Sequence, residues 1–427
     1  MEIAIIALGS RGDVQPYLAL GVGLKRAGHH VRVVTHEDFE SLTQAHGLTY
    51  YGVKGSVQAI ANSPEMTALL EKGNFIAITA KTAKAVQKVV VEWSQDGLEA
   101  CRGADLIIAG IGGMFVGLAL GEKLGIPIMQ AHLVPFTATR AFPSVLLPAG
   151  AERLGGWFKR LSHRLTQQAI WQGVRSADNL ARKTALGLKP VSFWGPFQSA
   201  LLKQYPTLYG FSPSVIPKPD DWGDEAQVTG YWFLEADESW QPPAALTRFL
   251  EDGSKPIYIG FGSMSQRKPD ETTKLILKAL ADTGQRAILL SGWGGLKAGD
   301  LPDTVYMAES IPHAWLFERV AAVVHHGGAG TTAAGLRAGV PSIIIPFMAD
   351  QPFWGRRAAA LGVGTEPIRR QQLTAERLAG AIRQVTDDRG MQERARALGE
   401  AIRQEDGVGR AVAVIQAHSP FSKPGRV

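Results

Sequence analysis

The sequence predicts an α/β protein made of two domains, each built on a parallel β-sheet. Two observations carry this prediction. Short apolar segments alternate with amphipathic helical segments along most of the chain, and glycine-rich turns directly follow several of the apolar segments. Parallel strands joined by helices are buried on both faces and therefore read as nearly continuous apolar runs. Because the alternation stops at a polar, proline-rich segment and then resumes, we expect two such domains.

The first domain begins with a strand predicted over residues 2–8, which is rich in Ile and Ala. A glycine turn follows, and then a helix that starts near Pro16 and ends at Gly28, with Leu18, Leu20, Leu24 and Ala27 directed inward. The next strand is predicted over 30–35. The same order recurs as a strand, a helix and a strand at 104–109, 115–124 and 127–132.

The domain boundary is predicted where three prolines and several acidic residues interrupt the pattern, at about 211–228. Beyond it the strands are expected at 257–261, 287–291, 320–325 and 342–346, and helices at 270–283 and 331–338. A charged helical segment closes the chain, and its last part is apolar enough to pack on another element, such as the first domain. The predicted division is a domain at 1–212, a linker at 213–227, a domain at 228–405 and a helix or tail at 406–427.

Composition excludes several classes of protein. With 45% hydrophobic and 20% charged residues, the chain is too apolar to be disordered and too polar to span a membrane many times. Its single cysteine, Cys101, excludes a disulfide framework and a thiolate zinc site. A net charge of +6 is too small to suggest a nucleic-acid-binding protein. The N-terminus lacks the features of a signal peptide and no apolar run is long enough to span a bilayer, so we expect a cytoplasmic protein.

Glycine is unusually frequent, at 48 of 427 residues. Four informative glycine-rich turns each follow a predicted strand and precede a predicted helix, at 9–12, 260–262, 292–295 and 327–330. Such turns let backbone N–H groups approach a ligand, and the helix that follows favours an anion. Since three of the four lie in the second domain, we expect a phosphorylated ligand there. Neither a GxGxxG fingerprint nor a P-loop is present, which disfavours a dehydrogenase and excludes a P-loop nucleotidase.

The segment HHGGAGTTAAGLRAGVPSIIIPFMADQPFWG at 325–355 resembles the donor-binding signature of family 1 nucleotide-sugar glycosyltransferases, most closely the sterol and lipid glucosyltransferase branch. GSRGDVQP at 9–16, VTGYWFL at 228–234 and GFGSM at 260–264 are similar to motifs of the same branch. The resemblance spans about 350 residues. It implies the GT-B architecture, in which two Rossmann-like domains face each other across a cleft. The acceptor would bind on the N-terminal side and the nucleotide sugar on the C-terminal side.

The resemblance also implies roles for residues of the second domain. His326 corresponds to the signature histidine that contacts the donor phosphate, and the other candidate diphosphate contacts are Ser263, Gly328, Thr331 and Thr332. Asp350 and Gln351 are expected to bind hydroxyls of the donor hexose. Trp293 and Ile311 are candidates to border the nucleobase, although a tryptophan is often simply a core residue.

One position departs from the family pattern. Plant members carry a glutamate that binds ribose eight residues after the signature histidine, where this chain has Ala334. The choice between a uridine and a thymidine donor therefore stays open, with UDP-glucose preferred as the co-substrate. No DxD motif is present, so we expect catalysis without a metal ion and without a further cofactor.

Asp13 is the predicted general base. The acceptor hydroxyl is a very weak acid, and a base that takes its proton during attack on the anomeric carbon accelerates transfer by about 10²–10⁴. The expected reaction is an inverting single displacement that yields a β-glycoside. The alternative for Asp13 is that it only caps the helix entered near Pro16.

The acceptor is expected to contact the aromatic and aliphatic segment 132–160. The candidates there are His132, Phe136, Phe142 and Trp157. Such a lining suits a flat apolar alcohol, for example a sterol, triterpenoid, polyketide or flavonoid. An ordinary hydrophobic core would give the same composition.

Residues 151–203 contain nine Lys or Arg and two acidic residues, interleaved with aromatic residues. This segment is either a peripheral contact with an anionic membrane or a solvated basic helix face. Two other functions stay open for the whole chain. One is a nucleotide-sugar epimerase of the same architecture, and the other is a catalytically silent accessory homologue.

Overall fold

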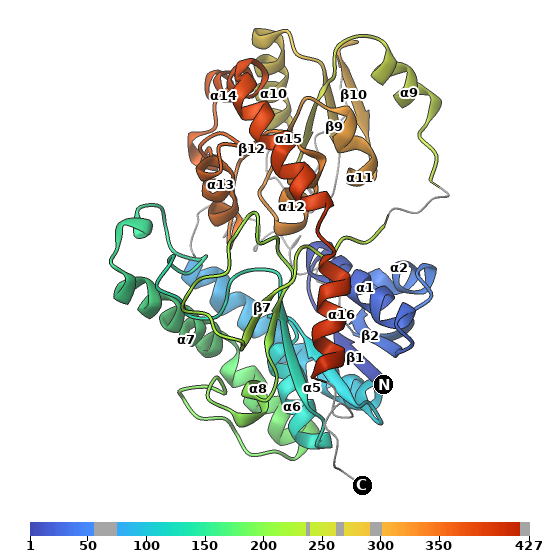
Figure 1. The fold of residues 1–427 in the computed structure, drawn as a ribbon, viewed down its shortest axis with the longest axis vertical. Helices are drawn as coiled ribbons and strands as arrows, with labels where there is room; N and C mark the ends of the chain where they lie inside the picture. Colours follow the sequence, from blue (N-terminus) through green and yellow to red (C-terminus); the bar gives the residue numbers. More distant parts are fainter. Residues whose placement is uncertain (55–74, 236–239, 262–268, 291–300, 419–427) are drawn as a thin grey trace. The chain divides into compact units, whose positions relative to one another are not determined.

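The structure is a computed structural model that describes residues 1–54, 75–235, 240–261, 269–290 and 301–418 (Figure 1). The chain forms two compact units. Of the described residues, unit 1 comprises 1–54, 75–234 and 405–418, and unit 2 comprises those between 235 and 404. Both units are α/β structures with parallel sheets, which confirms the predicted fold class.

In the described part of unit 1, seven strands form one sheet in the order β3-β2-β1-β4-β5-β6-β7, and every pairing is parallel. The central strand β1 pairs with β2 and β4 on either side, with Ile3 opposite both Val31 and Leu106. Burial on both faces explains why β1 is apolar throughout. The strands are β1 Glu2–Ile6, β2 His30–His36, β3 Thr49–Val53, β4 Leu106–Ala109, β5 Ile128–His132, β6 Thr207–Tyr209 and β7 Ala226–Val228.

Helices cover both faces of this sheet. One face packs on α1 and α16, and the other on α5 and α6, with residues of α7 joining the second layer. The helices are α1 Arg11–Arg26, α2 Glu40–Ala45, α5 Phe75–Cys101, α6 Met114–Leu124, α7 Gly156–Ala181, α8 Ala200–Lys203 and α16 Gly407–Ala417.

Two details predicted for the first helix were wrong. The helix α1 begins at Arg11 rather than near Pro16, because Ser10 and Asp13 form a capping box that starts it earlier. Ala27 is exposed at the end of the helix instead of facing inward, whereas Leu18, Leu20 and Leu24 are buried as expected. The earlier start places Asp13 inside the first turn.

In the described part of unit 2, five parallel strands form a sheet in the order β10-β9-β8-β11-β12. One face packs on α10 and α14, and the other on α9, α11 and α12. The strands are β8 Ile257–Gly260, β9 Ala287–Leu290, β10 Val305–Ala308, β11 Ala322–His325 and β12 Ser342–Ile344. The helices are α9 Ala244–Glu251, α10 Pro269–Thr283, α11 His313–Leu316, α12 Ala329–Ala338, α13 Gln351–Ala360, α14 Ala375–Asp387 and α15 Arg389–Arg403.

The segment expected to be a linker, 213–227, is part of unit 1. It contributes strand β7 to the sheet and buries Val215, Ile216 and Trp222, so its prolines shape a packed surface segment instead of a free connection. Within the described residues, the chain crosses between the units at 234–235 and again at 404–405.

Helix α16 belongs to unit 1, where it lies beside α1 (Figure 1). Ala411, Val412 and Ile415 join the core formed by α1 and the sheet. Gly23 of α1 permits the close approach, since a Cβ there would lie 2.3 Å from Cγ1 of Val408. Among the described residues, no helix combines the length and the apolar character that crossing a membrane requires.

Candidate active site

Asp13 lies at the third position of α1, at the carboxyl edge of the unit 1 sheet. Its Oδ2 accepts a hydrogen bond from the Ser10 N–H at 2.9 Å and another from the Ser10 hydroxyl at 2.8 Å. The side chain keeps an accessible surface. Even so, the surrounding protein raises the pKa of Asp13 by disfavouring the charged form, while the bonds from Ser10 act in the opposite direction. A carboxylate with a raised pKa is a stronger base than an ordinary one.

The turn before α1 is shaped around this carboxylate. Gly9 has φ +145°, a conformation that L-residues with side chains rarely adopt. A Cβ on Gly9 would lie 2.6 Å from Oδ2 of Asp13. Glycine is therefore required here both by the backbone and by the position of the Asp13 side chain.

Tyr17, one helical turn after Asp13, connects this turn to strand β5. Its hydroxyl donates to the carbonyl of Ala131 at 2.5 Å, and its ring packs edge-on against Trp232. Burial and the nearby Asp13 both raise the pKa of Tyr17, so the phenol stays protonated. The residue after Ala131 is His132, which places this acceptor candidate at the same sheet edge as Asp13.

Three of the four acceptor candidates belong to one aromatic cluster in unit 1. The ring of His132 lies 5.0 Å from Phe136 and 6.0 Å from Tyr209, and Tyr209 stacks on Trp222 at 4.7 Å. Phe142 joins the cluster through Trp222. Burial lowers the pKa of His132 to about 3, so this histidine is neutral at physiological pH.

Two polar atoms in this cluster stay unsatisfied. Nδ1 of His132 and Nε1 of Trp222 are buried and have no hydrogen-bond partner among the described residues. Buried polar groups are nearly always paired, so an unpaired one marks a place for a water molecule or a ligand. The fourth candidate, Trp157, lies apart from the cluster on α7, where 63% of it is exposed.

Unit 2 carries a candidate site of its own at the start of α12. Strand β11 ends at His325, which is fully buried and whose Nδ1 accepts a hydrogen bond from the Gly327 N–H at 3.0 Å. Gly327 has φ +88°, so the chain turns sharply before the helix. Gly328 is the N-cap and has no side chain to satisfy the N–H groups of the first turn. This helix end is therefore suited to bind an anion.

His326 lies against this helix end. A Cβ on Gly328 would come 2.5 Å from Nε2 of His326, which shows how closely the ring approaches the backbone. Burial lowers the pKa of His326 to about 4, so its ring is neutral. Its Nδ1 is buried and lacks a partner among the described residues. A neutral imidazole in this position can donate a hydrogen bond to a ligand oxygen.

The two threonines of the signature differ in their surroundings. Thr332 is buried, and its hydroxyl donates to the Gly328 carbonyl at 2.9 Å, so it holds the turn in place. Thr331 is only partly buried, and it lies in the first turn of α12. Of the two hydroxyls, that of Thr331 is the better placed to reach a ligand.

Asp350 and Gln351 begin α13. Gln351 is buried, and its Oε1 accepts hydrogen bonds from the N–H groups of Phe347 and Met348 at 2.7 and 3.0 Å. Oδ2 of Asp350 accepts a bond from Nε1 of Trp354 at 2.7 Å. Since both acceptors already hold the local chain, the Nε2 amide of Gln351 is the part of that side chain left for a ligand.

The residue before Asp350 is strained. Ala349 has φ +53°, which is unusual for a residue with a side chain and costs about 1 kcal/mol. Strain of this kind persists where the surrounding structure over-determines it, and it clusters at functional sites. Here the bonds to Gln351 are what hold the loop in place.

The two parts of the 325–355 segment meet in space. A Cβ on Gly327 would lie 3.0 Å from the carbonyl oxygen of Gln351, so the turn before α12 directly contacts the start of α13. The turn with the candidate diphosphate residues His326 and Gly328 and the start of α13 with the candidate sugar residues are therefore neighbours in unit 2.

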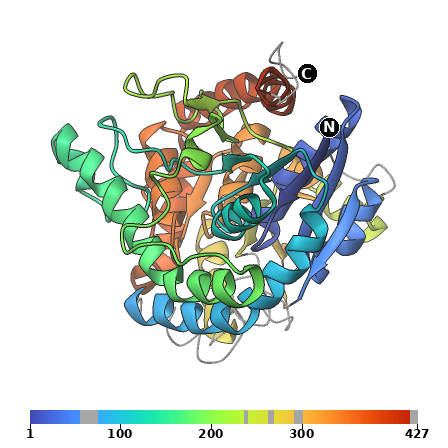
Figure 2. The ribbon, with the colours of Figure 1, turned by 90° about the horizontal axis from the view of Figure 1, so that it is seen from below.

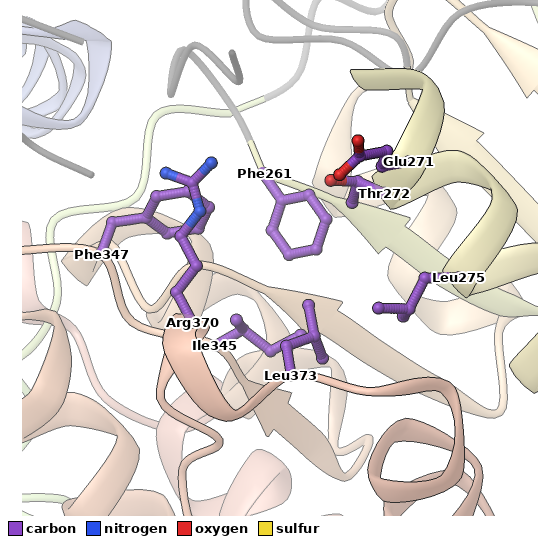
Figure 3. Close-up of a pocket in the computed structure, with 8 residues that line it drawn as sticks. All are labelled: Phe261, Glu271, Thr272, Leu275, Ile345, Phe347, Arg370 and Leu373. Carbon is purple, nitrogen blue, oxygen red and sulfur yellow. The ribbon is translucent and has the colours of Figure 1, made fainter. Parts of the chain in front are cut away.

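A cavity of about 160 Å³ borders this surface in unit 2. It shares Phe347 with the loop that Gln351 holds. Figure 3 shows Phe261 facing the cavity. Arg370 and Phe347 lie on one side of it, and Glu271 and Thr272 lie on the other. The Arg370 guanidinium lies 4.8 Å from the centre of the Phe347 ring. The remaining lining residues are apolar: Leu275, Ile345 and Leu373.

Three further candidates have other locations. Ile311 is 4% exposed and packs in the core of unit 2 with Leu316 and Phe317, so it has a packing role there. Ser263 and Trp293 lie outside the described residues. Ala334, the position that departs from the family pattern, packs partly buried against the same core. Among the described residues, no group of three or more His, Cys, Asp or Glu side chains is arranged to hold a metal ion.

Two residues of this region escaped the sequence analysis. Ser10 was detectable, because Ser-x-x-Asp at 10–13 has the spacing of a capping box. Arg370 gave no such signal, since it lies in a polar segment after the recognised motif and reaches the cavity only through the fold.

Comparisons with known proteins agree with these observations. Residues 3–143 match the glycosyltransferase family 28 N-terminal domain, and residues 275–406 match the erythromycin biosynthesis protein CIII-like C-terminal domain. A sterol 3-beta-glucosyltransferase of Arabidopsis thaliana is 37% identical, over 99% of this chain and 69% of that protein. One of Cryptococcus neoformans is also 37% identical, over 99% of this chain and 27% of that protein.

The chain spans less than two thirds of the length of most of the curated relatives that it matches. Among solved structures, the glycosyltransferase VinC in complex with dTDP superposes with a TM-score of 0.66 at 17% identity, over 98% of this chain and 99% of that one. At that identity the likeness is one of fold.

Proposed function

Because the chain belongs to the GT-B glycosyltransferase family that includes the sterol 3-beta-glucosyltransferases, we propose that it transfers a hexose from a nucleotide sugar to a hydroxyl group of a lipophilic alcohol. The preferred donor is UDP-glucose and the preferred acceptor a sterol. The observation that carries the proposal is the contact between the His326 turn and the start of α13, which joins an anion site to sugar-binding groups.

Unit 2 holds the donor in this proposal. The first-turn N–H groups of α12 and the neutral ring of His326 bind the diphosphate. The leaving nucleotide gains negative charge during the reaction, and donors fixed in advance stabilise that charge. The Nε2 amide of Gln351 and the carboxylate of Asp350 bind sugar hydroxyls, with the strained Ala349 turn fixing their direction.

Unit 1 supplies the base. Asp13 takes the proton of the acceptor hydroxyl while the acceptor oxygen attacks the anomeric carbon. The bond between that carbon and the phosphate oxygen breaks, and the nucleoside diphosphate leaves. The configuration at the anomeric carbon inverts, so an α-linked donor gives a β-glycoside. The raised pKa of Asp13 supports this role, because a more basic carboxylate accepts the proton more readily.

The choice of acceptor rests on the relatives and on unit 1. The curated relatives are named for transfer to a sterol. The cluster of His132, Phe136 and Phe142 places aromatic rings at the sheet edge that carries Asp13, with His132 and Phe136 themselves buried. The Nδ1 of His132 has no hydrogen-bond partner among the described residues, which supports a polar group of the acceptor or a water molecule beside it.

The test is an assay of purified protein with UDP-glucose and a sterol, in which the product is identified by mass. The Asp13→Asn variant should lower kcat by at least about 10² while the affinity for UDP is unchanged. TDP-glucose is assayed in parallel, because Ala334 stands where plant members have the glutamate that binds ribose. Near wild-type turnover in Asp13→Asn would remove Asp13 as the base, and absence of transfer to every lipophilic alcohol would favour an accessory protein.

A further inference from the structure

Large exposed hydrophobic side chains are concentrated in one part of unit 1. Among the described residues, all of them lie between 154 and 194, with 41–76% of each residue exposed. Single exposed apolar residues need no explanation, but a cluster of this kind marks an interaction site. The residues are Leu154, Trp157, Phe158, Leu165, Leu180, Phe193 and Trp194.

The first part of the cluster lies on the N-terminal half of α7. Trp157, Leu161 and Leu165 are spaced four residues apart, which places them on one face of the helix. Phe158 flanks that face, with its ring 4.9 Å from that of Trp157. Helix α7 lies at the periphery of unit 1 in both views (Figures 1 and 2). Trp157, Phe158 and Leu165 are 55–63% exposed, so the part of the chain that the structure describes leaves this face largely uncovered.

The segment 191–197 continues the same face along the second half of α7. The amides of Gln168 and Gln172 both donate to the carbonyl of Phe193, at 2.9 and 2.7 Å. Gln168 and Gln172 follow Trp157 and Leu165 on the same side of the helix. The Phe193 and Trp194 rings are therefore presented on the side to which the first half of α7 directs its own aromatic residues.

The presentation of these rings is built into the structure. Trp171 is fully buried, and its Nε1 donates to the Ser192 carbonyl at 3.1 Å. The side-chain amide of Asn179 donates to the Val191 carbonyl and accepts a hydrogen bond from the Val191 N–H. The inner side of the segment is thus anchored by hydrogen bonds, while Trp194 stays 76% exposed. A side chain held out by an anchored backbone is poised to contact something outside the chain.

Positive charge accompanies the aromatic residues. Residues 151–203 carry nine Lys or Arg and two acidic residues, so their net charge of +7 exceeds the +6 of the entire chain. Arg153, Arg160, Arg164, Lys183 and Lys189 are exposed. The Arg175 guanidinium lies 5.5 Å from the centre of the Phe193 ring, so cation and aromatic ring are adjacent. We call Trp157, Phe158, Leu165, Phe193, Trp194 and the exposed cations the aromatic–basic face.

We propose that the aromatic–basic face binds the surface of an anionic lipid bilayer. Tryptophan and phenylalanine insert at the level of the headgroups, and lysine and arginine are attracted to anionic lipids, so both halves of the pattern fit one occupant. A second copy of the chain is disfavoured as the occupant, because two faces that each carry these five exposed cations would repel each other. The inference does not depend on the transfer reaction, although a lipophilic acceptor would reside in the same bilayer.

The test is flotation of the purified chain with vesicles, without donor or acceptor. One set contains phosphatidylcholine alone and the other includes about 30% phosphatidylserine. We expect the protein to float with the anionic vesicles and to be released at high salt, because salt screens the attraction of the cations. Tryptophan fluorescence should shift to shorter wavelength on binding, as Trp194 leaves water.

Matched variants locate the contact. Arg164→Gln with Lys183→Gln should weaken binding about 25-fold, since each cation near an anionic bilayer contributes about fivefold. Arg389→Gln with Arg396→Gln makes the same change of charge on exposed residues of α15 and should bind like the wild type. Phe158→Ser with Trp194→Ser should reduce both binding and the fluorescence shift.

Several results would overturn the proposal. The proposal is wrong if the wild type fails to float with anionic vesicles, or if both variants of the aromatic–basic face bind the vesicles as the wild type does. If the face instead binds a protein partner, the chain will not bind these protein-free vesicles, and the proposal is also wrong. Association into a dimer that the same substitutions abolish, without vesicle binding, would assign the face to a second copy. Melting temperatures of all variants establish that a loss of binding is not a loss of folding.

Discussion

Asp13 accepts two hydrogen bonds from a single residue, Ser10, one from its N–H at 2.9 Å and one from its hydroxyl at 2.8 Å. The same pair begins helix α1 as a capping box. The arrangement holds the carboxylate still and sets its basicity, because the bonds favour the charged form while the surrounding protein disfavours it. The capping role of Asp13 is therefore compatible with the proton transfer that we propose for the same side chain.

The hydroxyl of Ser10 should tune the acidic limb of the pH profile. Ser10→Ala removes one bond to the carboxylate, which raises the pKa of Asp13 further, so activity is lost at a higher pH than in the wild type. A bond of about 1 kcal/mol corresponds to a displacement of just under one pH unit. The measurement is kcat/KM against pH, with Ser10→Thr as the control that keeps a hydroxyl. Coincident acidic limbs for the alanine variant and the wild type would contradict the assignment of Asp13.

Gly9→Ala should damage catalysis as well as stability. The new Cβ would lie 2.6 Å from Oδ2 of Asp13 and would also strain a backbone with φ +145°. The control is Gly28→Ala, where φ is +86° and no atom lies within 4 Å of the added carbon. Both variants should melt at lower temperature, but only Gly9→Ala should lower kcat, by about tenfold or more. An equal kcat in the two variants would show that the Asp13 geometry does not depend on Gly9.

The sequence predicted best those elements that can be recognised from the residues within them alone. Strands such as β1 and β11 are apolar over their whole length because both faces are buried, and a sequence displays that directly. The turns with Gly9 and Gly327 were also recognisable, and both have positive φ. The segment 213–227 was misjudged because proline and acidic residues mark a turn-rich surface without saying whether its apolar residues are packed.

The candidate site was predicted less completely, for a physical reason. Asp13 and His326 stand beside glycine turns, so their positions at a sheet edge follow from strand-turn-helix order. Ile311 lies in the core and Arg370 lines a cavity, and in both cases the location depends on contacts between segments far apart in the chain. The hydrogen bonds that Gln351 accepts from the Phe347 and Met348 N–H groups likewise could not be predicted from the sequence, because they depend on how the loop folds.

Binding of a nucleotide sugar should be independent of pH between about 5.5 and 8. Burial lowers the pKa of His326 to about 4, so the ring is neutral throughout that range and contributes a hydrogen bond rather than a charge. Calorimetry with UDP-glucose in the absence of acceptor measures this, and His326→Ala controls for other titrating groups. A rise in affinity as pH falls through 6.5, absent in His326→Ala, would mean that the histidine binds as a cation.

Asp178 gives a prediction about stability, independent of the site. It lies buried in α7, where burial raises its pKa to about 7, opposed by the Arg182 guanidinium and assisted by the Glu122 carboxylate. Arg182 is itself buried and pairs with Glu122 at 2.6 Å, so the cation next to Asp178 is already engaged. The folded chain therefore holds a proton on Asp178 that the unfolded chain, in which this carboxyl has its ordinary pKa of 3.8, releases.

The sign of the pH dependence follows from that difference. Between pH 4 and 7 the folded state binds more protons at this position than the unfolded state, so stability falls as pH rises through the window. Asp178→Asn removes the effect, and its advantage over the wild type should grow from near zero at pH 4 to about 4 kcal/mol at pH 8. Melting temperatures across this range measure it, with the exposed Asp252→Asn as the control. If Asp178→Asn instead destabilises the chain at pH 8, the carboxylate is ionised and paired with Arg182.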